Sequence, residues 1–301
     1  MAVATECRAA QLPLPGGKPG ATVRVHPLLT GEMRAPRVFC DRPSGPLGTV
    51  KIVAEAIGPR RRWEWLPIPA FLVEHPGAGP VLIDTGLHPS CETDVAANMG
   101  SFGRVLYSIR MNHDQALRFQ LPARGVQLKD VGVVIMTHLH IDHASAVSEF
   151  PSATFVVDRR EWDAAAAGGA LDGYHHRQFD HAFEWRALDY GADPVQSFSG
   201  FAHALDLFGD GSVRLVSTPG HTAGHQSVVL RTAGRELLVV ADAAYSERCL
   251  RGDAVPLRIH DEHLYHRSLN EIRRYLEQTP AALAIPGHDP AFWPTLDDLY
   301  A

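Results

Sequence analysis

The chain has 301 residues, of which 45% are hydrophobic and 21% are charged, and this is an ordinary composition for a globular protein. Its net charge is −6 and like charges form no long block, so the sequence lacks the basic surface with which proteins bind nucleic acids or anionic membranes. We therefore expect neither nucleic acid nor a membrane as a partner. The composition leaves the oligomeric state open.

The start of the chain lacks the basic residues and the apolar stretch of a secretory signal. No apolar run reaches the length of about 18 residues that a membrane-spanning helix needs. We expect a cytoplasmic location, with a flexible N-terminal arm at residues 1–20, which are rich in proline and glycine, and a single domain at residues 21–301. Four widely spaced cysteines are interpreted as reduced thiols without a shared role: Cys7, Cys40, Cys91 and Cys249.

Strand-like segments dominate the first part of the chain. Residues 22–31 and 50–58 are predicted to form strands, and residues 69–86, "PAFLVEHPGAGPVLIDTG", read as two strands joined by a Pro/Gly turn. Helices are predicted over residues 92–99 and 114–121. The continuous apolar run at 131–137 is typical of a strand that is buried on both faces.

The second part of the chain alternates strands with helices. The predicted elements are strands at 153–158, 213–220, 236–242 and 282–289, and helices at 160–168 and 261–279. The last of these helices has the clearest apolar stripe, and Pro280 follows its end. Residues 171–208, rich in aromatic residues and histidine, show no regular pattern and are expected to form a long functional or mobile loop.

Potential metal ligands follow the apolar strands. A rigid sheet holds such groups at the ends of its strands while the loops expose them, so this position is typical of active sites. Five strands each deliver a carboxylate or imidazole group at the C-terminal end: Asp84, the cluster of His138, His140, Asp142 and His143, then His221, Asp242 and His288.

The cluster "THLHIDH" carries the strongest signal. In an extended chain, side chains at i and i+2 share a face, so His138 and His140 can bind one metal ion together. Asp142 and His143 follow where the chain is expected to turn helical. Imidazole and carboxylate groups without cysteine suit zinc, although iron or manganese also fits. Seven candidate ligands exceed one tetrahedral site, so we predict two metal ions that share one carboxylate.

Four motifs in this order resemble the metallo-β-lactamase superfamily: "THLHIDH", "TPGHTAGHQS", "ADAAY" and "IPGHD". The resemblance spans roughly residues 68–288 and implies an α/β fold of the αββα sandwich type, with two mixed sheets face to face and helices outside. It also implies that Asp84, in "IDTG", supports a ligand histidine. The ligand sets implied are His138, His140 and His221 for the first ion and Asp142, His143 and His288 for the second, with Asp242 bridging the two.

Within this superfamily, the sequence is most similar to the N-acyl-homoserine lactonases, which act in quorum quenching. In that family a tyrosine three residues after the bridging aspartate points at the substrate carbonyl, and Tyr245 occupies this position. The resemblance implies lactone hydrolysis by hydroxide generated at two divalent ions, most simply Zn²⁺. Asp142 and Tyr245 are the predicted catalytic residues: Asp142 carries a proton to the leaving oxygen, and Tyr245 stabilises the oxyanion.

Other functions remain open at this point. A hydroxyacylglutathione-type thioesterase would share the ligands, but it would need basic residues for the glutathione carboxylates, which the sequence does not place. A phosphodiesterase would also use two metal ions, but the acidic net charge does not favour it. A non-catalytic binding scaffold of the same fold should have lost ligands, and none is missing here.

Overall fold

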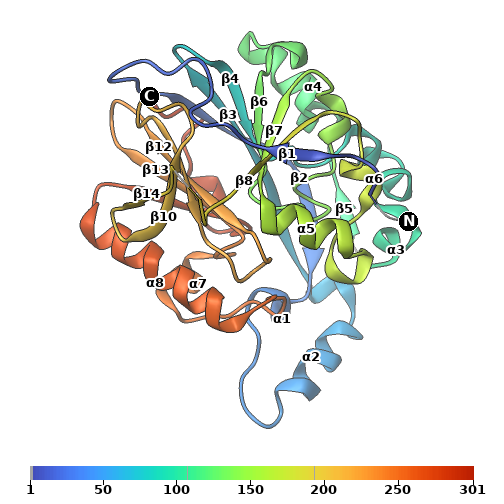
Figure 1. The fold of residues 1–301 in the computed structure, drawn as a ribbon. Coiled ribbons are helices and arrows are strands. Elements are labelled where there is room, and N and C mark those ends of the chain that lie inside the picture. Colours follow the sequence, from blue (N-terminus) through green and yellow to red (C-terminus); the bar gives the residue numbers. More distant parts are fainter. Residues whose placement is uncertain (1–2, 107, 193) are drawn as a thin grey trace.

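The computed structural model describes residues 3–106, 108–192 and 194–301, whose strands form two sheets (Figure 1). The first sheet has eight strands in the order β1 (Cys7–Ala9), β8 (Glu184–Leu188), β7 (Thr154–Asp158), β6 (Val133–Ile135), β4 (Gly79–Ile83), β3 (Glu64–His75), β2 (Arg24–Ala35) and β5 (Ser108–Arg110). The second has six strands in the order β14 (Leu283–Pro286), β13 (Glu236–Ala241), β12 (Gln226–Arg231), β11 (Val213–Ser217), β10 (Phe201–Asp206) and β9 (Gln196–Phe198).

The helices lie outside the two sheets. They are α1 (Arg37–Cys40), α2 (Gly48–Ala56), α3 (Val95–Leu106), α4 (Leu117–Gln120), α5 (Arg159–Ala167), α6 (His176–Phe179), α7 (Glu247–Arg251) and α8 (Glu262–Gln278). Apolar residues of α4, α5 and α6 share a core with the outer face of the first sheet, and those of α7 and α8 with the outer face of the second. A third core fills the space between the sheets. The predicted αββα sandwich is therefore confirmed.

Two of the clearest local predictions hold in detail. Strands β3 and β4 form the expected antiparallel hairpin, with Phe71 opposite Ile83. The predicted helix at 261–279 is α8, which begins after Asp261, whose side chain accepts a hydrogen bond from the backbone N–H of Leu264 at 2.8 Å. Its buried residues recur at helical spacing, so one face packs on the second sheet: Tyr265, Leu269, Ile272 and Tyr275.

Strand direction brings the predicted ligands to one edge of the sandwich. Strands β4, β6 and β7 are parallel to one another in the first sheet. In the second sheet β13 is parallel to β14, and β11 runs the same way because β12 is antiparallel to both β11 and β13. The loops that follow β4, β6, β11, β13 and β14 therefore leave the sheets at the same edge, where they carry the candidate ligands.

The structure corrects the prediction for residues 50–58. This segment was predicted to be a strand because β-branched residues favour strands, but it lies in helix α2, which projects from the sandwich (Figure 1). Its apolar residues recur every three or four positions, which is the helical period. Leu47, Val50 and Val53 are largely exposed on it. Spacing is therefore the better guide here than composition.

Two segments expected to be irregular contain strands. Within residues 1–20, Cys7–Ala9 forms β1, which pairs in parallel with β8, and Leu12 and Leu14 pack against the core between the sheets. The described part of this segment is therefore not a free arm. Residues 171–208 contain α6 and the whole of β8, β9 and β10 rather than one long loop. The alternation of buried Trp185 and Ala187 with less buried neighbours in β8 is a strand pattern that the prediction overlooked.

Two further predicted helices are shorter or shifted. Helix α3 begins at Val95 rather than at residue 92, and α4 covers only Leu117–Gln120. The segment after "THLHIDH" forms turns and one short 3₁₀ turn at Val147–Glu149, not an α-helix. Among the described residues, no helix combines the length and apolar character needed to cross a membrane.

Candidate metal centre

The seven predicted ligands meet at the edge of the sandwich where the five strands end. His138, His140, Asp142 and His143 lie in the loop after β6, and the other three follow strands of the second sheet. All seven side chains are buried, with at most 7% of each residue exposed. Buried ionisable groups at this density are costly unless they bind one another or a cation.

The ligands form two groups. His138, His140, His221 and Asp242 offer atoms that all lie within 4.8 Å of one another, and so do Asp142, His143 and His288. The two sets are those that the resemblance implied, with Asp242 counted in the first. Each set has the size expected for one ion bound mainly by imidazole groups.

Asp242 connects the two groups because its carboxylate contacts imidazoles of both, and Nε2 of His288 lies 3.3 Å from Oδ2 as well as close to Oδ1. Oδ1 lies 3.1 Å from Nε2 of His288 and 3.4 Å from Nε2 of His143. Oδ2 lies 3.3 Å from Nε2 of His221 and 3.8 Å from Nε2 of His138. A carboxylate held in this way can bind one ion with each oxygen. Only glycine fits at position 287, since a Cβ there would come 2.4 Å from Oδ1 of Asp242.

The imidazole rings are oriented as metal ligands. Nδ1 of His143 lies 2.7 Å from Asp84, and Nδ1 of His288 lies 2.8 Å from the Pro67 carbonyl oxygen. Their Nε2 atoms face the centre. Nε2 of His138 and of His143 are buried and have no hydrogen-bond partner among the described residues. A buried nitrogen without a partner is rare in proteins, and a cation would supply the missing contact. The donor set therefore fits a divalent metal ion.

Charge within the cluster sets the protonation of these rings. Burial, with the neighbouring imidazoles His143 and His140, holds the pKa of His138 well below its usual range, so this ring is neutral. Burial opposes charge on His143 as well, but the carboxylates of Asp242, Asp142 and Asp84 outweigh it and raise its pKa. The nearby imidazoles, chiefly those of His288 and His143, outweigh burial and lower the pKa of Asp242. The carboxylate is thus ionised, as a metal ligand must be.

Asp84 lies beside the ligands, in the position expected of a support. Its oxygens accept hydrogen bonds from the backbone N–H of Thr137 at 2.7 Å, from the Thr137 hydroxyl at 2.7 Å and from His143 Nδ1 at 2.7 Å. The residue has a positive φ of 55°, a conformation that non-glycine residues rarely adopt. This conformation directs the carboxylate toward the loop that carries His138 and His143.

His225 is a supporting residue that the prediction did not single out. It is fully buried, and its Nε2 accepts the backbone N–H of Asp242 at 3.1 Å. Its Nδ1–H therefore donates to Thr218 Oγ1, 2.9 Å away. Burial lowers the pKa of His225 to about 3, so it stays neutral in this role. It is the second histidine of "TPGHTAGHQS", and its position in that motif could have identified it from the sequence.

Glu161 on α5 is another supporting residue that the prediction missed. Its buried carboxylate accepts the backbone N–H of Leu139 at 2.9 Å and that of Gly224 at 3.2 Å, and the hydroxyl of Tyr174 at 3.2 Å. It thus ties the loop of His138 and His140 to the loop of His221. Nothing in the sequence marked this glutamate, because its partners are backbone groups far from it in the chain.

Tyr245 lies beside the two ligand groups, where it was expected. Its ring packs edge-on between His221 and His288, with centroid distances of 5.4 and 5.2 Å, and is almost fully buried. Together with Asp142, Asp242 and His288 it lines a small cavity of about 20 Å³ at the centre of the site. A carbonyl group held in this cavity would lie next to both Tyr245 and the ligands.

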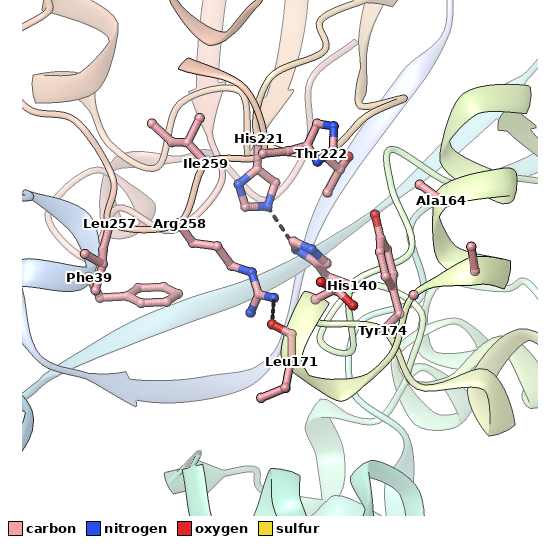
Figure 2. Close-up of a pocket in the computed structure, with 14 residues that line it drawn as sticks. Phe39, His140, Ala164, Leu171, Tyr174, His221, Thr222, Leu257, Arg258 and Ile259 are labelled. Carbon is pink, nitrogen blue, oxygen red and sulfur yellow. Dashed lines mark hydrogen bonds between the residues drawn. The ribbon is translucent and has the colours of Figure 1, made fainter.

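A larger pocket of about 750 Å³ opens beside the first ligand group. Figure 2 shows His221, His140 and Tyr174 on one side of it, with Arg258 reaching in from the other side toward Leu171. Most of its remaining lining is apolar, including Phe39, Ala164 and Ile259. The site can thus hold a molecule with one polar end at the ligands and an apolar remainder.

Comparisons with known proteins agree with this geometry. The family model of the metallo-β-lactamase superfamily matches residues 63–288. The N-acyl homoserine lactonase AttM of Azorhizobium caulinodans is 34% identical over 237 residues, which cover 76% of this chain and 84% of that protein. A structure of an N-acyl homoserine lactone hydrolase with the product N-hexanoyl-L-homoserine at its catalytic metal centre has a TM-score of 0.74 at 21% identity, covering 92% of this chain and 97% of that one. The dizinc quorum-quenching lactonase AidC has a TM-score of 0.59 at 17% identity, covering 93% and 90%.

Proposed function

The chain belongs to the metallo-β-lactamase superfamily, and from this membership we propose that it hydrolyses the lactone ring of N-acyl homoserine lactones with two divalent metal ions. The observation that carries the proposal is the placement of Asp242, whose carboxylate contacts imidazoles of both groups of candidate ligands. The lactone specificity is supported by the relatives named as N-acyl homoserine lactonases and by Tyr245 at the centre of the site.

The proposed ligand sets follow the two groups. His138, His140 and His221 would hold one ion, Asp142, His143 and His288 the other, and Asp242 would bridge them. We propose Zn²⁺, because imidazole and carboxylate donors suit it and because AidC, a protein of the same fold, is described as a dizinc enzyme. When bound, the two cations would lower the pKa of water toward neutrality and polarise the lactone carbonyl.

Tyr245 and Asp142 have separate proposed roles. Burial, with the nearby carboxylates Asp242 and Asp142, raises the pKa of Tyr245 well above its usual range, so its hydroxyl stays protonated and can donate a hydrogen bond to the carbonyl oxygen. Asp142 Oδ2 lies 3.5 Å from His288 Nε2 and 3.8 Å from His143 Nε2. It would take up the proton of the attacking water and deliver it to the leaving alkoxide, so that the product is an open-chain hydroxy acid.

The substitution Tyr245→Phe tests the first of these roles. It removes one donor and almost no volume from a buried position. We expect kcat to fall about 10–100-fold, below the 10²–10³-fold typical of losing one oxyanion donor, because the metal ion would still polarise the same oxygen. KM should change little, since the hydrogen bond strengthens only as charge develops. Metal content and melting temperature should stay at the wild-type value, and wild-type kcat in the variant would show that Tyr245 only packs.

A substrate panel tests the function as a whole. Purified metal-replete protein should hydrolyse an N-acyl homoserine lactone, with the released acid followed by titration. A glutathione thioester and a phosphodiester serve as the alternative substrates. If the protein hydrolysed either of them orders of magnitude faster than any lactone, the proposal would be overturned. The pocket gives a physical reason to expect the lactone: Arg258 is its one arginine or lysine among the described residues, whereas glutathione carries two carboxylates.

We further propose that the enzyme works in the cytoplasm. Its four cysteines are free thiols, as is usual in reducing compartments.

A further inference from the structure

Arg258 has unsatisfied donors in the pocket beside the metal centre. Its guanidinium donates one hydrogen bond, from Nη2 to the Leu171 carbonyl oxygen at 2.6 Å (Figure 2). No carboxylate among the described residues forms an ion pair with it. A guanidinium has five N–H donors in a planar fork, and most of them therefore remain for a ligand or for water in the pocket.

The position of Arg258 is between the pocket and the ligands. It lines both the large pocket and the small central cavity that contains Asp142, Asp242 and Tyr245. Gly173 locates it relative to the ligands, since a Cβ at that position would come 2.9 Å from His140 Nε2 and 3.1 Å from the Arg258 Cζ atom. The guanidinium and the His140 imidazole are thus neighbours next to Gly173.

Much of the remaining pocket lining is apolar, although Asp172, Thr222 and His260 also line the pocket. The apolar lining residues include Phe39, Ala164, Ala167, Leu171 and Ile259. These side chains suit a hydrocarbon chain and offer no polar partner to it. A ligand that extends from the metal centre into this pocket therefore meets one guanidinium and several apolar side chains.

We propose that Arg258 binds the amide oxygen of the N-acyl group and thereby selects lactones that carry an acylamino substituent next to the reacting carbonyl. The proposal rests on the proposed lactone hydrolysis and adds the group that recognises the substituent. In an N-acyl homoserine lactone the amide is attached to the ring carbon beside the lactone carbonyl, so its oxygen lies only a few bonds from the reacting atom. With the lactone carbonyl in the central cavity, the amide oxygen reaches the guanidinium and the alkyl chain enters the apolar part of the pocket.

The test compares two lactones that differ in the amide. N-hexanoyl homoserine lactone carries it, whereas α-octyl-γ-butyrolactone bears a similar chain on the same ring carbon without it. The wild type should prefer the first, and Arg258→Met should lower its kcat/KM about 10–100-fold, as expected for losing a hydrogen bond from a charged donor. The loss should appear mainly in KM, because the amide oxygen gains no charge in the reaction.

The same variant should lower the kcat/KM of α-octyl-γ-butyrolactone far less than that of N-hexanoyl homoserine lactone, with its metal content at the wild-type value. Arg258→Lys, which keeps the charge, should recover part of the preference. Arg267→Met is the matched control, because Arg267 lies on α8 outside the pocket and pairs only at 3.7 Å with Glu271; it should retain the full preference.

Three results would overturn the assignment of Arg258: equal losses on both lactones, no loss on either, or a wild type without preference for the amide. Equal losses would mean that Arg258 only shapes the pocket through its bond to Leu171. Failure of the proposed function gives a different result, because the wild type itself would then hydrolyse neither lactone.

Discussion

Removal of metal ions with a strong chelator is expected to abolish lactone hydrolysis and to lower the melting temperature. At the candidate centre, Nε2 of His138 and Nε2 of His143 are buried and have no hydrogen-bond partner among the described residues. Ions that bind only the folded chain raise its free energy of unfolding, so removal of the cations lowers that free energy. Elemental analysis of metal-replete protein should give about two divalent ions per chain, as a dinuclear site requires.

Readdition of Zn²⁺ should restore both the activity and the melting temperature. A single tightly held ion, or none, after metal-replete expression would contradict the dinuclear proposal. Full activity in chelated, metal-free protein would contradict any role of metal in the reaction. The buried imidazoles would then require another explanation.

The parts of the site that the sequence predicted are those encoded locally. His138, His140, Asp142 and His143 lie within six positions after an apolar strand, and the strand itself fixes their common edge. The remaining ligands also follow strands, so their shared location depends only on strand direction in the two sheets. The grouping of the ligands into two sets came from the family resemblance, and the distances around Asp242 agree with it.

The parts that escaped prediction depend on contacts between distant segments. The carbonyl oxygen of Pro67 orients His288 across 221 positions of the chain, and Glu161 connects two ligand loops through their backbone N–H groups. No residue pattern encodes such a contact, because any residue supplies a backbone group. Arg258 was not predicted for a similar reason: its proposed role depends on the pocket that it lines, and the residues next to it in the sequence do not indicate that pocket.

Asp242→Asn should be far more damaging than Asp84→Asn, although both change a buried carboxylate to an amide. The amide introduced at position 242 would present one oxygen and one NH₂ group, and the NH₂ has no lone pair for an ion. Asp242 contacts His221 of the first group at 3.3 Å and His288 of the second at 3.1 Å, and one of these groups would lose the ligand that they share. Breaking a buried charge pair typically costs about 3–5 kcal/mol, so we expect kcat/KM to fall by about 10²–10⁴-fold and at most one ion to remain.

The Asp84→Asn variant keeps all seven ligands and changes only their support. Its amide oxygen can still accept the backbone N–H of Thr137, but the acceptor of His143 Nδ1–H is weakened or replaced by a donor. Losing such support typically costs about 10–100-fold in metal affinity or activity. The two variants are distinguished by measuring kcat/KM together with the metal content after dialysis against a weak chelator. If both lost the same number of ions and the same activity, Asp242 would be one more support of the histidines and the two ligand groups would not be bridged by it.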